Sequence, residues 1–317
     1  MEFNGILPMA KIPVERFTGS LLGLALGDAF GAPLEGGPIE RFVWRLIGKT
    51  RSGKMRWTDD TQMSLDLAES LISNGCLDCD DAARRFAASY RWSRGYGPSA
   101  ARLLKKIRRG ADWREANQTV FKKGSFENGG AMRSPVVGLF FAGCMKEVAA
   151  AARESASITH AHPLGLEGAV FIAVATATAS LLGQPHEVFE SAAAHCAQPE
   201  FLRRAEVADI WLKSDSPLRA SDVRSQLGNG IAAAQSCVTA AYIAVRFVHR
   251  PFDEMLSFVA SCRGDVDTIG AMAGAIWGAS RGVSELPADH LNQLEQRDRI
   301  EEIAVSLYQR LASSGKS

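Results

Sequence analysis

Two segments rich in glycine and alanine lie near opposite ends of the chain, at residues 19–28 and 271–279. Their apolar character fits helices, and of their residues only Asp28 carries a charge. A glycine inside a helix costs about 1 kcal/mol relative to alanine, so such helices usually occur where two backbones approach closely. We therefore expect both segments to form helices at the centre of the fold, next to acidic loops.

Most of the remaining chain also has helical periodicity. Met63, Leu67 and Leu71, for example, share one helical face that ends at Asn74-Gly75. Further helices are predicted over residues 80–91, from 98 to about 110, and over 147–158, 166–182, 187–196, 201–213, 238–248, 252–261 and 299–312. No segment alternates long enough to predict a strand, and no linker or repeat divides the chain. The predicted fold is all-α: a single compact orthogonal helical bundle with a central two-metal cleft. Residues 1–14 are predicted to be a flexible leader and 15–317 one domain.

Bulk properties narrow the class of protein. The 317 residues carry a net charge of about +1, so no overall field attracts nucleic acid or anionic membranes. The chain does not open like a secretory signal, and its longest apolar run, residues 169–182, is too short to span a bilayer. We therefore expect a cytoplasmic protein without direct nucleic-acid or membrane partners, with a monomer as the default.

The six cysteines are scattered along the chain. Cys76 and Cys79 form a C-x-x-C pair, but no second pair follows at the spacing of a zinc ribbon. A zinc or redox role is the alternative, and incidental or buried thiols in a reducing compartment are the expectation.

Two acidic clusters mark the chain as a candidate metal protein. They are Thr58-Asp59-Asp60 and Asp265-Val266-Asp267-Thr268, and each opens an apolar helical stretch. Carboxylates and hydroxyls are hard ligands that suit Mg²⁺ or Mn²⁺. Helix capping is the alternative, but one cap needs one acceptor, and the spare carboxylates would repel each other without a cation. If the fold joins the clusters, they form a two-metal hydrolytic site.

Other candidate residues lie in glycine-rich loops. Glu35 precedes Gly36-Gly37, which would let its carboxylate swing into a site, although a surface glutamate is the alternative. The loop at residues 122–130 leads into Ala131-Met132-Arg133 and could cradle a diphosphate at a helix start, or be a plain turn. Phe121 and Phe126 bracket this loop and could stack on an adenine or clasp a ribose, or plug the core. His160 and His162 lie at a helix end, where favouring the helix dipole is the alternative.

Together these segments resemble the ADP-ribosylglycohydrolase family of helical hydrolases. The resemblance runs from about Arg16 to the C-terminus. It rests on Gly27-Asp28-Ala29-Phe30-Gly31-Ala32 with Glu35, Thr58-Asp59-Asp60-Thr61, Asn128-Gly129-Gly130-Ala131-Met132-Arg133, Ile158-Thr159-His160 and Gly264-Asp265-Val266-Asp267-Thr268.

Within the family, the chain is most similar to the branch that removes ADP-ribose from serine and also cleaves poly(ADP-ribose) and O-acetyl-ADP-ribose. The motifs of this likeness are Arg94-Gly95-Tyr96-Gly97, Lys123-Gly124-Ser125-Phe126, Leu227-Gly228-Asn229-Gly230-Ile231, and Asp267-Thr268-Ile269 followed by residues 272–276. The arginine-linkage branch usually carries an aspartate where this chain has Gly95, which argues against a guanidinium pocket.

The resemblance implies roles for particular residues. Two Mg²⁺ ions, with Mn²⁺ as the alternative, would be held by Glu35, Thr58, Asp59, Asp60, Asp265, Asp267 and Thr268. Glu35 and Asp59 would be the catalytic carboxylates, with Glu35 mobile. Substrate would be bound by Gly95, Tyr96, Gly97, Phe121, Lys123, Gly124, Ser125, Phe126, Asn128, Gly129, His160 and Ile231. The chain departs from the family pattern at Phe126, Glu127 and Arg263, and Glu127 places negative charge near the expected diphosphate.

The predicted reaction is hydrolysis at ribose C1″ of an ADP-ribosyl group, through an oxocarbenium-like transition state and direct attack by water. The partners would be ADP-ribose and ADP-ribosylated proteins. Three alternatives stay open: an arginine-linkage hydrolase, a catalytically silent ADP-ribose binder, and a metal-dependent phosphatase.

Overall fold

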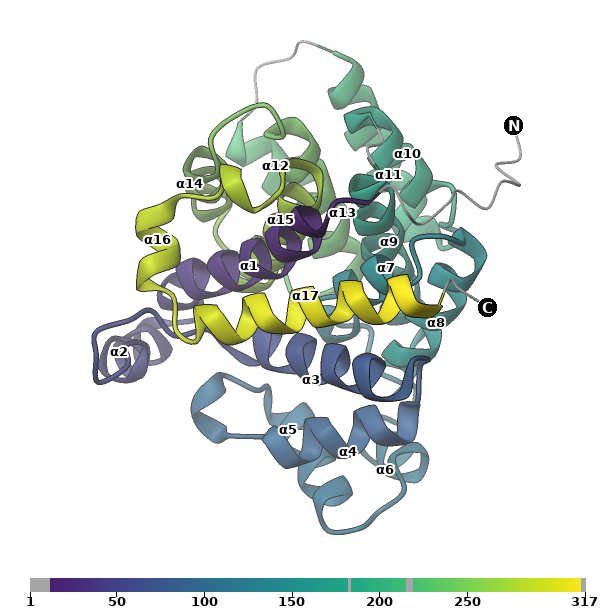
Figure 1. Cartoon of the computed structure of the whole chain (residues 1–317). Coiled ribbons are helices and arrows are strands. Elements are labelled where there is room, and N and C mark those ends of the chain that lie inside the picture. Colours follow the sequence, from purple (N-terminus) through teal and green to yellow (C-terminus); the bar gives the residue numbers. More distant parts are fainter. Residues whose placement is uncertain (1–11, 182–183, 215–218, 315–317) are drawn as a thin grey trace.

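The computed structural model describes residues 12–181, 184–214 and 219–314. Two antiparallel helices, α1 (Val14–Gly31) and α15 (Val266–Arg281), form its centre (Figure 1). Glycines meet along their contact: a Cβ on Gly23 would lie 2.3 Å from the carbonyl oxygen of Gly274, and one on Gly278 would lie 2.0 Å from that of Gly19. Only glycine permits backbones this close, as the sequence predicts.

The other helices surround this pair. Their bounds are α2 Pro38–Ile47, α3 Asp59–Asn74, α4 Cys79–Ser89, α5 Pro98–Arg108, α6 Trp113–Val120, α7 Ser134–Phe140, α8 Met145–Ser157, α9 Pro163–Ser180, α10 Pro185–Ala193, α11 Pro199–Lys213, α12 Ala220–Gln226, α13 Ala233–Arg246, α14 Phe252–Cys262, α16 Ala288–Gln293 and α17 Arg297–Ser314. Short 3₁₀ turns are η2 Ala32–Leu34, η3 Trp92–Arg94, η4 Asn128–Gly130 and η5 Val283–Glu285. In the described ranges, β pairing is limited to isolated bridges, so the predicted all-α class is confirmed.

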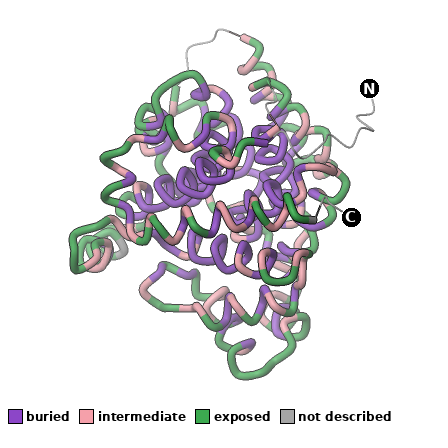
Figure 2. Tube along the Cα trace, viewed as in Figure 1, coloured by how far each residue is buried: buried purple, intermediate pink, exposed green. Residues whose placement is uncertain are grey.

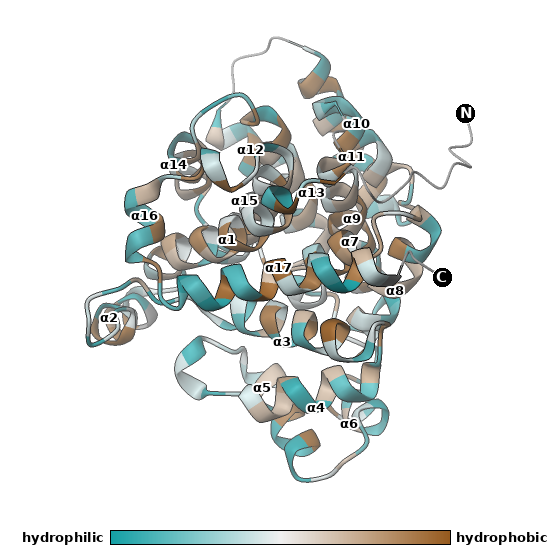
Figure 3. Ribbon diagram, in the orientation of Figure 1, coloured by the Kyte–Doolittle hydropathy of each residue, from teal (hydrophilic) through white to brown (hydrophobic). Residues whose placement is uncertain are grey.

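Burial follows the layers of the bundle. α1, α9, α13 and α15 are buried along most of their length, whereas α2 lies at the periphery (Figure 2). The outer helix α17 shows teal and brown residues alternating along its length (Figure 3), as an amphipathic helix should. Residues 14–34 and α9 are long and apolar enough to cross a membrane by length and composition, but 83% of each is buried inside the bundle, as in core helices.

The predicted helical segments are confirmed to within a few residues at most ends. Residues 182 and 1–11 lie outside the described residues; Ile12 is buried and α1 already begins at Val14, inside the predicted leader. The helix expected directly after residue 130 begins only at Ser134, because Asn128–Gly130 forms a 3₁₀ turn. The six cysteines are free thiols, and Cys79 is buried while Cys76 is exposed.

Candidate active site

Three chain segments deliver carboxylates to one place: the end of α1, the start of α3 and the start of α15. Gly31 permits the first contact, because a Cβ there would lie 2.3 Å from the Cα of Asp267. The chain then turns through η2, which places Glu35 beside the first turn of α15. The two acidic clusters, some two hundred residues apart in sequence, therefore converge as predicted.

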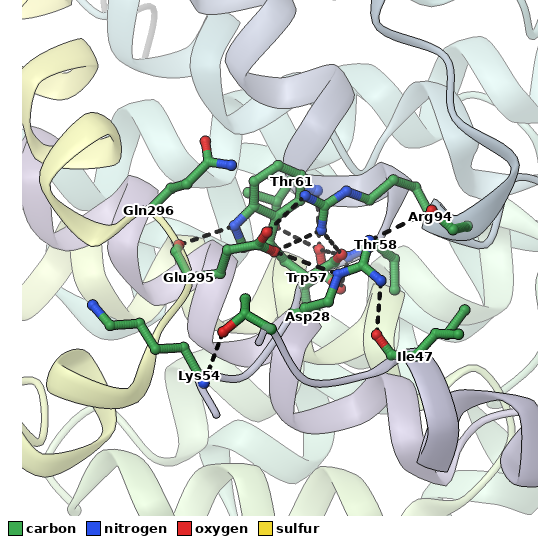
Figure 4. A network of polar contacts seen from close by, with 12 residues as sticks. Asp28, Ile47, Lys54, Trp57, Thr58, Thr61, Arg94, Glu295 and Gln296 are labelled. Atoms are coloured by element: carbon green, nitrogen blue, oxygen red, sulfur yellow. Dashed lines mark hydrogen bonds and ion pairs between the residues drawn. The ribbon is translucent and has the colours of Figure 1, made fainter. Parts of the chain in front are cut away.

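Asp28 anchors the turn that precedes α3 (Figure 4). Its Oδ1 accepts a hydrogen bond of 2.9 Å from the Thr58 amide, and its Oδ2 accepts from the Thr61 amide at 3.0 Å and from the Thr61 hydroxyl at 2.5 Å. Asp28 is fully buried inside α1, and burial raises its pKa to about 6 despite these donors. The buried carboxylate of Asp28 thus fixes the direction in which Asp59 and Asp60 leave the turn.

A second polar cluster supports the same turn from behind. Arg94 donates to the backbone oxygen of Trp57 at 2.7 Å and to the carboxylate of Glu295 at 2.8 Å, and its guanidinium stacks on the Trp57 ring (Figure 4). The indole of Trp57 donates to the backbone oxygen of Glu295 at 3.1 Å. Arg94, which the sequence motif included, is therefore a structural residue just before the turn glycine Gly95.

The carboxylates form one buried cluster. Oxygens of Glu35, Asp265 and Asp267 lie within 4.8 Å of one another, and so do oxygens of Asp28, Asp60 and Asp267. Asp267 belongs to both groups, so the groups adjoin. In the described part of the chain, none of the ion pairs involves a member of either group. The buried Oδ2 of Asp60 has no hydrogen-bond partner there.

Burial and mutual repulsion hold protons on these groups. Burial, reinforced by Asp265 and Asp59, raises the pKa of Glu35 to about 7. Burial and the charge of Asp267 raise the pKa of Asp265 to about 8, and those of Asp59, Asp60 and Asp267 also lie well above the usual range. Such crowding of buried carboxylates requires protons or a cation. The all-oxygen donor set and the orphaned oxygen of Asp60 fit a hard divalent cation.

A cavity of about 260 Å³ opens over the cluster. Glu35, Asp59, Asp60, Asp265, Asp267 and Thr268 line its acidic end. The rest of its wall includes the predicted substrate residues Gly95, Gly97, Phe121, Asn128, Gly129, His160 and Ile231, and also Glu127. The cavity therefore joins the acidic cluster to most of the residues predicted for the nucleotide.

Some predicted residues lie outside this wall. Thr58 is buried as the N-cap of α3, with its hydroxyl accepting from the Asp60 amide. Tyr96 is buried against the ring of Tyr90. In the 122–130 loop, Lys123 and Phe126 are exposed, and Ser125 is buried and contacts the Glu127 carboxylate. Gly124 packs on the backbone of residues 161–162, with a φ of 76°. The metal role of Thr58 and the substrate roles of the other residues stay predictions.

The loop containing Ile231 connects the two halves of the site. The amide of Asn128 donates to the backbone oxygen of Ile231, and the amide of Asp265 donates to that of Asn229, both at 2.9 Å. The side-chain amide of Asn128 closes the loop by donating to the carboxylate of Asp265 and to the Ser236 hydroxyl. Asn128 therefore couples the predicted nucleotide loop to the acidic cluster.

A buried relay orients His160. The guanidinium of Arg133 donates to the Thr159 hydroxyl at 3.0 Å, and that hydroxyl lies 2.7 Å from Nδ1 of His160. Burial and the Arg133 charge lower the pKa of His160 to about 3. Because the Thr159 hydroxyl accepts from the guanidinium, its own hydrogen is available to Nδ1, and this arrangement favours the tautomer of His160 with the proton on Nε2. Nε2 lies next to Gly129 in the cavity wall.

Comparison with known proteins decides the family. A family model described as ADP-ribosylglycohydrolase matches residues 9–316. The chain belongs to the ADP-ribosylglycohydrolase family. The recognition made from its motifs is thereby confirmed, and with it the prediction of an enzyme that hydrolyses glycosyl bonds.

Individual relatives cover nearly the whole chain. An uncharacterized protein of Archaeoglobus fulgidus is 34% identical and covers 93% of this chain and 96% of its own. ADP-ribosylhydrolase ARH3 of Bos taurus is 32% identical, covering 93% of both chains. A solved structure named "ADP-ribosylglycohydrolase-related protein complex" is 26% identical with a TM-score of 0.71, covering 95% of this chain and 99% of that one.

The structure of this ADP-ribosylglycohydrolase adds residues that sequence reasoning did not assign to the site. Asp28 was part of a motif but not a predicted site residue; its only local signal is a charge in the otherwise uncharged segment 19–28. Arg133 and Thr159 were likewise motif residues without a role. Their hydrogen bond joins positions 26 residues apart, and such a pairing leaves no local pattern.

Proposed function

We propose that this protein is a metal-dependent hydrolase that cleaves the ribose C1″ bond of O-linked ADP-ribosyl groups and releases ADP-ribose. Serine-linked protein adducts are the proposed substrates, with poly(ADP-ribose) and O-acetyl-ADP-ribose as further candidates. The observation that carries the proposal is the buried carboxylate cluster at the end of a cavity in an ADP-ribosylglycohydrolase. A merely structural relative would have no reason to keep so many uncompensated carboxylates buried.

The donor set is proposed to hold two Mg²⁺ ions, with Mn²⁺ as the alternative. Glu35, Asp265 and Asp267 would hold one, and Asp60 and Asp267 the other, with Asp59, Thr58 and Thr268 completing the ligands. Ions bound there would polarise the ribose hydroxyls and lower the pKa of an attacking water. Asp28 uses both its oxygens on the turn before α3, so we assign it to positioning.

Glu35 is proposed as the proton-transfer group. Its carboxyl lines the cavity, and in the metal-free protein burial raises its pKa to about 7. A cation bound beside it would lower this pKa, which suits a carboxylate that first accepts a proton from the attacking water and then returns it. Gly36, with a φ of 73°, follows it and gives the segment a conformation that other residues rarely adopt. The Nε2 hydrogen of His160 would be a fixed donor to the bound nucleotide.

The linkage is inferred from two features. The position before Tyr96 is Gly95, which lines the cavity and offers no carboxylate to a guanidinium. The ARH3 relative, named an ADP-ribosylhydrolase, covers both chains almost completely. We propose a cytoplasmic monomer that acts on ADP-ribosylated proteins, without nucleic-acid or membrane partners.

The test is release of ADP-ribose from a panel of serine-linked, arginine-linked and acetyl-ester substrates, with Mg²⁺ and then with EDTA. We expect turnover of O-linked substrates that EDTA abolishes. Glu35→Gln should lower kcat by a factor of about 10²–10⁴, the usual contribution of a general acid or base. Its ADP-ribose affinity should change little.

Other outcomes would assign other functions. A preference for arginine-linked substrate would replace the linkage proposed here. ADP-ribose binding without any turnover by the wild type would make the chain a silent binder. Release of inorganic phosphate from ADP-ribose would indicate a phosphatase.

A further inference from the structure

The helix α2 presents an apolar face to solvent. Ile39, Phe42, Val43 and Leu46 have the spacing of one helical face, and Ile39 is 75%, Phe42 60% and Leu46 70% exposed. The helix contacts the protein on its other side, through the buried indole of Trp44. Val43 is 38% exposed, and within the described part of the chain most of the surface of the other three side chains is uncovered. Contiguous exposed apolar side chains of this kind mark interaction surfaces.

A cationic rim surrounds this face. Between residues 38 and 56, six residues are Lys or Arg and one is Glu, although the whole chain is nearly neutral. Arg41, Arg45, Lys49, Arg51 and Lys54 are exposed, and none forms an ion pair with a described residue. We call these five residues, together with Ile39, Phe42, Val43 and Leu46, the α2 surface. Its charge complements an acidic partner.

The helix α2 is connected at both ends to segments of the cavity wall. Glu35 lines the cavity, and Pro38, three residues later, begins α2. At the other end of the helix, Arg56 donates to the backbone oxygen of Ile47 at 2.7 Å and approaches the Ser93 hydroxyl at 3.5 Å. Ser93 follows Trp92, which is 73% exposed, and precedes Gly95 in the cavity wall. Arg56 thus joins the end of α2 to the segment that leads to Gly95 in the cavity wall.

We propose that the α2 surface docks an acidic, apolar segment of the ADP-ribosylated protein whose modified side chain occupies the cavity. This inference rests on the proposed function and adds how the enzyme recognises its macromolecular substrate. The apolar face would take the partner's apolar side chains, and the rim would take its carboxylates. A second copy of the chain would bring the same cationic rim against this one. The connection of α2 to the wall of the cavity that receives the modified side chain favours a protein partner over a membrane.

The experiment compares two synthetic peptides, each with one ADP-ribosylserine. One continues into a segment that alternates Leu or Phe with Asp or Glu, and the other continues into Gly-Ser repeats. We expect the wild type to release ADP-ribose from the acidic peptide with a kcat/KM about tenfold higher, mainly through KM, as for loss of one small interface contact.

Two variants and a control locate the effect. Phe42→Ser/Leu46→Ser removes the apolar contact, and Arg45→Glu/Lys49→Glu reverses the charge. Both should lose the preference while keeping the wild-type rate on the Gly-Ser peptide. Leu202→Ser/Ile210→Ser, which alters exposed apolar residues on α11, should keep the preference. Equal kcat/KM for the two peptides in the wild type would overturn the proposal.

A binding measurement separates this inference from the proposed function. If the wild type releases ADP-ribose from neither peptide, the proposed linkage is wrong. Fluorescence anisotropy with the unmodified acidic peptide then tests whether the α2 surface binds such a segment. Binding that either α2 variant weakens supports the docking, and the absence of such binding overturns it.

A dimer that Phe42→Ser/Leu46→Ser dissociates in sedimentation would assign the surface to a second copy. Binding to phosphatidylserine vesicles instead of the peptide would assign it to a membrane. Either result overturns the proposal.

Discussion

At the scale of single residues, the orientation of His160 depends on a hydrogen bond that its own position does not reveal. A neutral histidine can carry its proton on either nitrogen, and the two forms offer opposite groups to a ligand. The Arg133, Thr159 and His160 contacts favour the form with the proton on Nε2, beside Gly129. Thr159 thus affects the cavity through His160, by influencing which ring nitrogen carries the proton.

Replacing Thr159 should separate this effect from packing. Thr159→Val keeps the shape and removes the hydroxyl, so both tautomers of His160 become accessible, and we expect ADP-ribose to bind about tenfold more weakly, the cost of about one hydrogen bond. Thr159→Ser keeps the hydroxyl and should bind within about twofold of the wild type. Calorimetry gives the affinities, and ¹⁵N NMR of His160 reports the tautomer directly. Unchanged ¹⁵N shifts in Thr159→Val would contradict the relay.

Arg263 is a residue in a backbone conformation suited to glycine. Its φ is 56° and its ψ is −167°, directly before Gly264 and Asp265. This region is essentially limited to glycine and costs other residues about 1–3 kcal/mol. The departure from the family pattern noted in the sequence therefore carries strain, and the side chain is exposed.

Arg263→Gly should consequently stabilise the protein. We expect the free energy of unfolding to rise by about 1 kcal/mol, because relief of strain exceeds the greater chain entropy of glycine in the unfolded state. Arg263→Ala is the matched control, since it removes the side chain but keeps the Cβ that causes the strain. Urea denaturation measures both variants. An equal gain in Arg263→Ala would show that the side chain, and not the backbone, is responsible.

At the scale of elements, the α1 and α15 pair connects packing to the site. Asp28 lies near the end of α1 and Asp267 in the first turn of α15, so the separation of the two helices sets the separation of these carboxylates. Gly23 and Gly274 meet in the middle of this contact. Any side chain there must push the helices apart, because the atoms in the way belong to backbone.

Gly274→Ala should therefore be costly. Its Cβ would lie 2.1 Å from the backbone oxygen of Gly23. We expect about 3 kcal/mol of destabilisation, at the upper end for overpacking, together with weaker Mg²⁺ binding. Gly97→Ala is a suitable control for stability, since a Cβ there would have no neighbour within 4 Å. Thermal unfolding and Mg²⁺ calorimetry measure the two effects. Stability equal to that of the control would contradict the backbone contact.

The same elements show what sequence reasoning can reach. The small-residue pattern predicted the central pair, because close contact between two helix backbones requires glycines such as Gly23 and Gly274 at the contact. α2 was not predicted. Its apolar residues face solvent, so they do not form the buried face from which the other helices were predicted. The acidic clusters were predicted because each is local, whereas the bonds from Asp28 to Thr58 and Thr61 join positions some thirty residues apart. Hydrogen bonds between residues far apart in the chain produce no periodic pattern in the sequence.

At the scale of the whole molecule, the acidic cluster couples folding to pH and to metal. The pKa of Glu35 is raised to about 7 and that of Asp265 to about 8, above the ordinary values of 4.5 and 3.8. Between pH 4 and 8 these two groups therefore bind more protons in the metal-free folded protein than in the unfolded chain. Their contribution to stability is greatest below the unfolded pKa values and is lost as pH rises through the folded ones.

Divalent cations should reverse this loss. They compete with the protons, so their stabilising effect should grow from pH 6 to pH 8 and reach about 2.7 kcal/mol at a hundredfold excess over Kd. Differential scanning fluorimetry with EDTA and with Mg²⁺ across this range measures the Tm shift.

Asp66 supplies the control for this experiment. It lies away from the cavity wall, buried between Gln62 and Ser89, and burial raises its pKa to about 7. Asp66→Asn should reduce the decrease in stability between pH 4 and 7 but leave the Mg²⁺ shift unchanged. Asp267→Asn removes the carboxylate shared by both groups and should abolish most of the Mg²⁺ shift. A Tm shift that is independent of pH would mean that Mg²⁺ binds elsewhere, because binding at these crowded carboxylates must release protons. A Tm shift that persists in Asp267→Asn would mean the same, because this variant lacks the carboxylate shared by both groups.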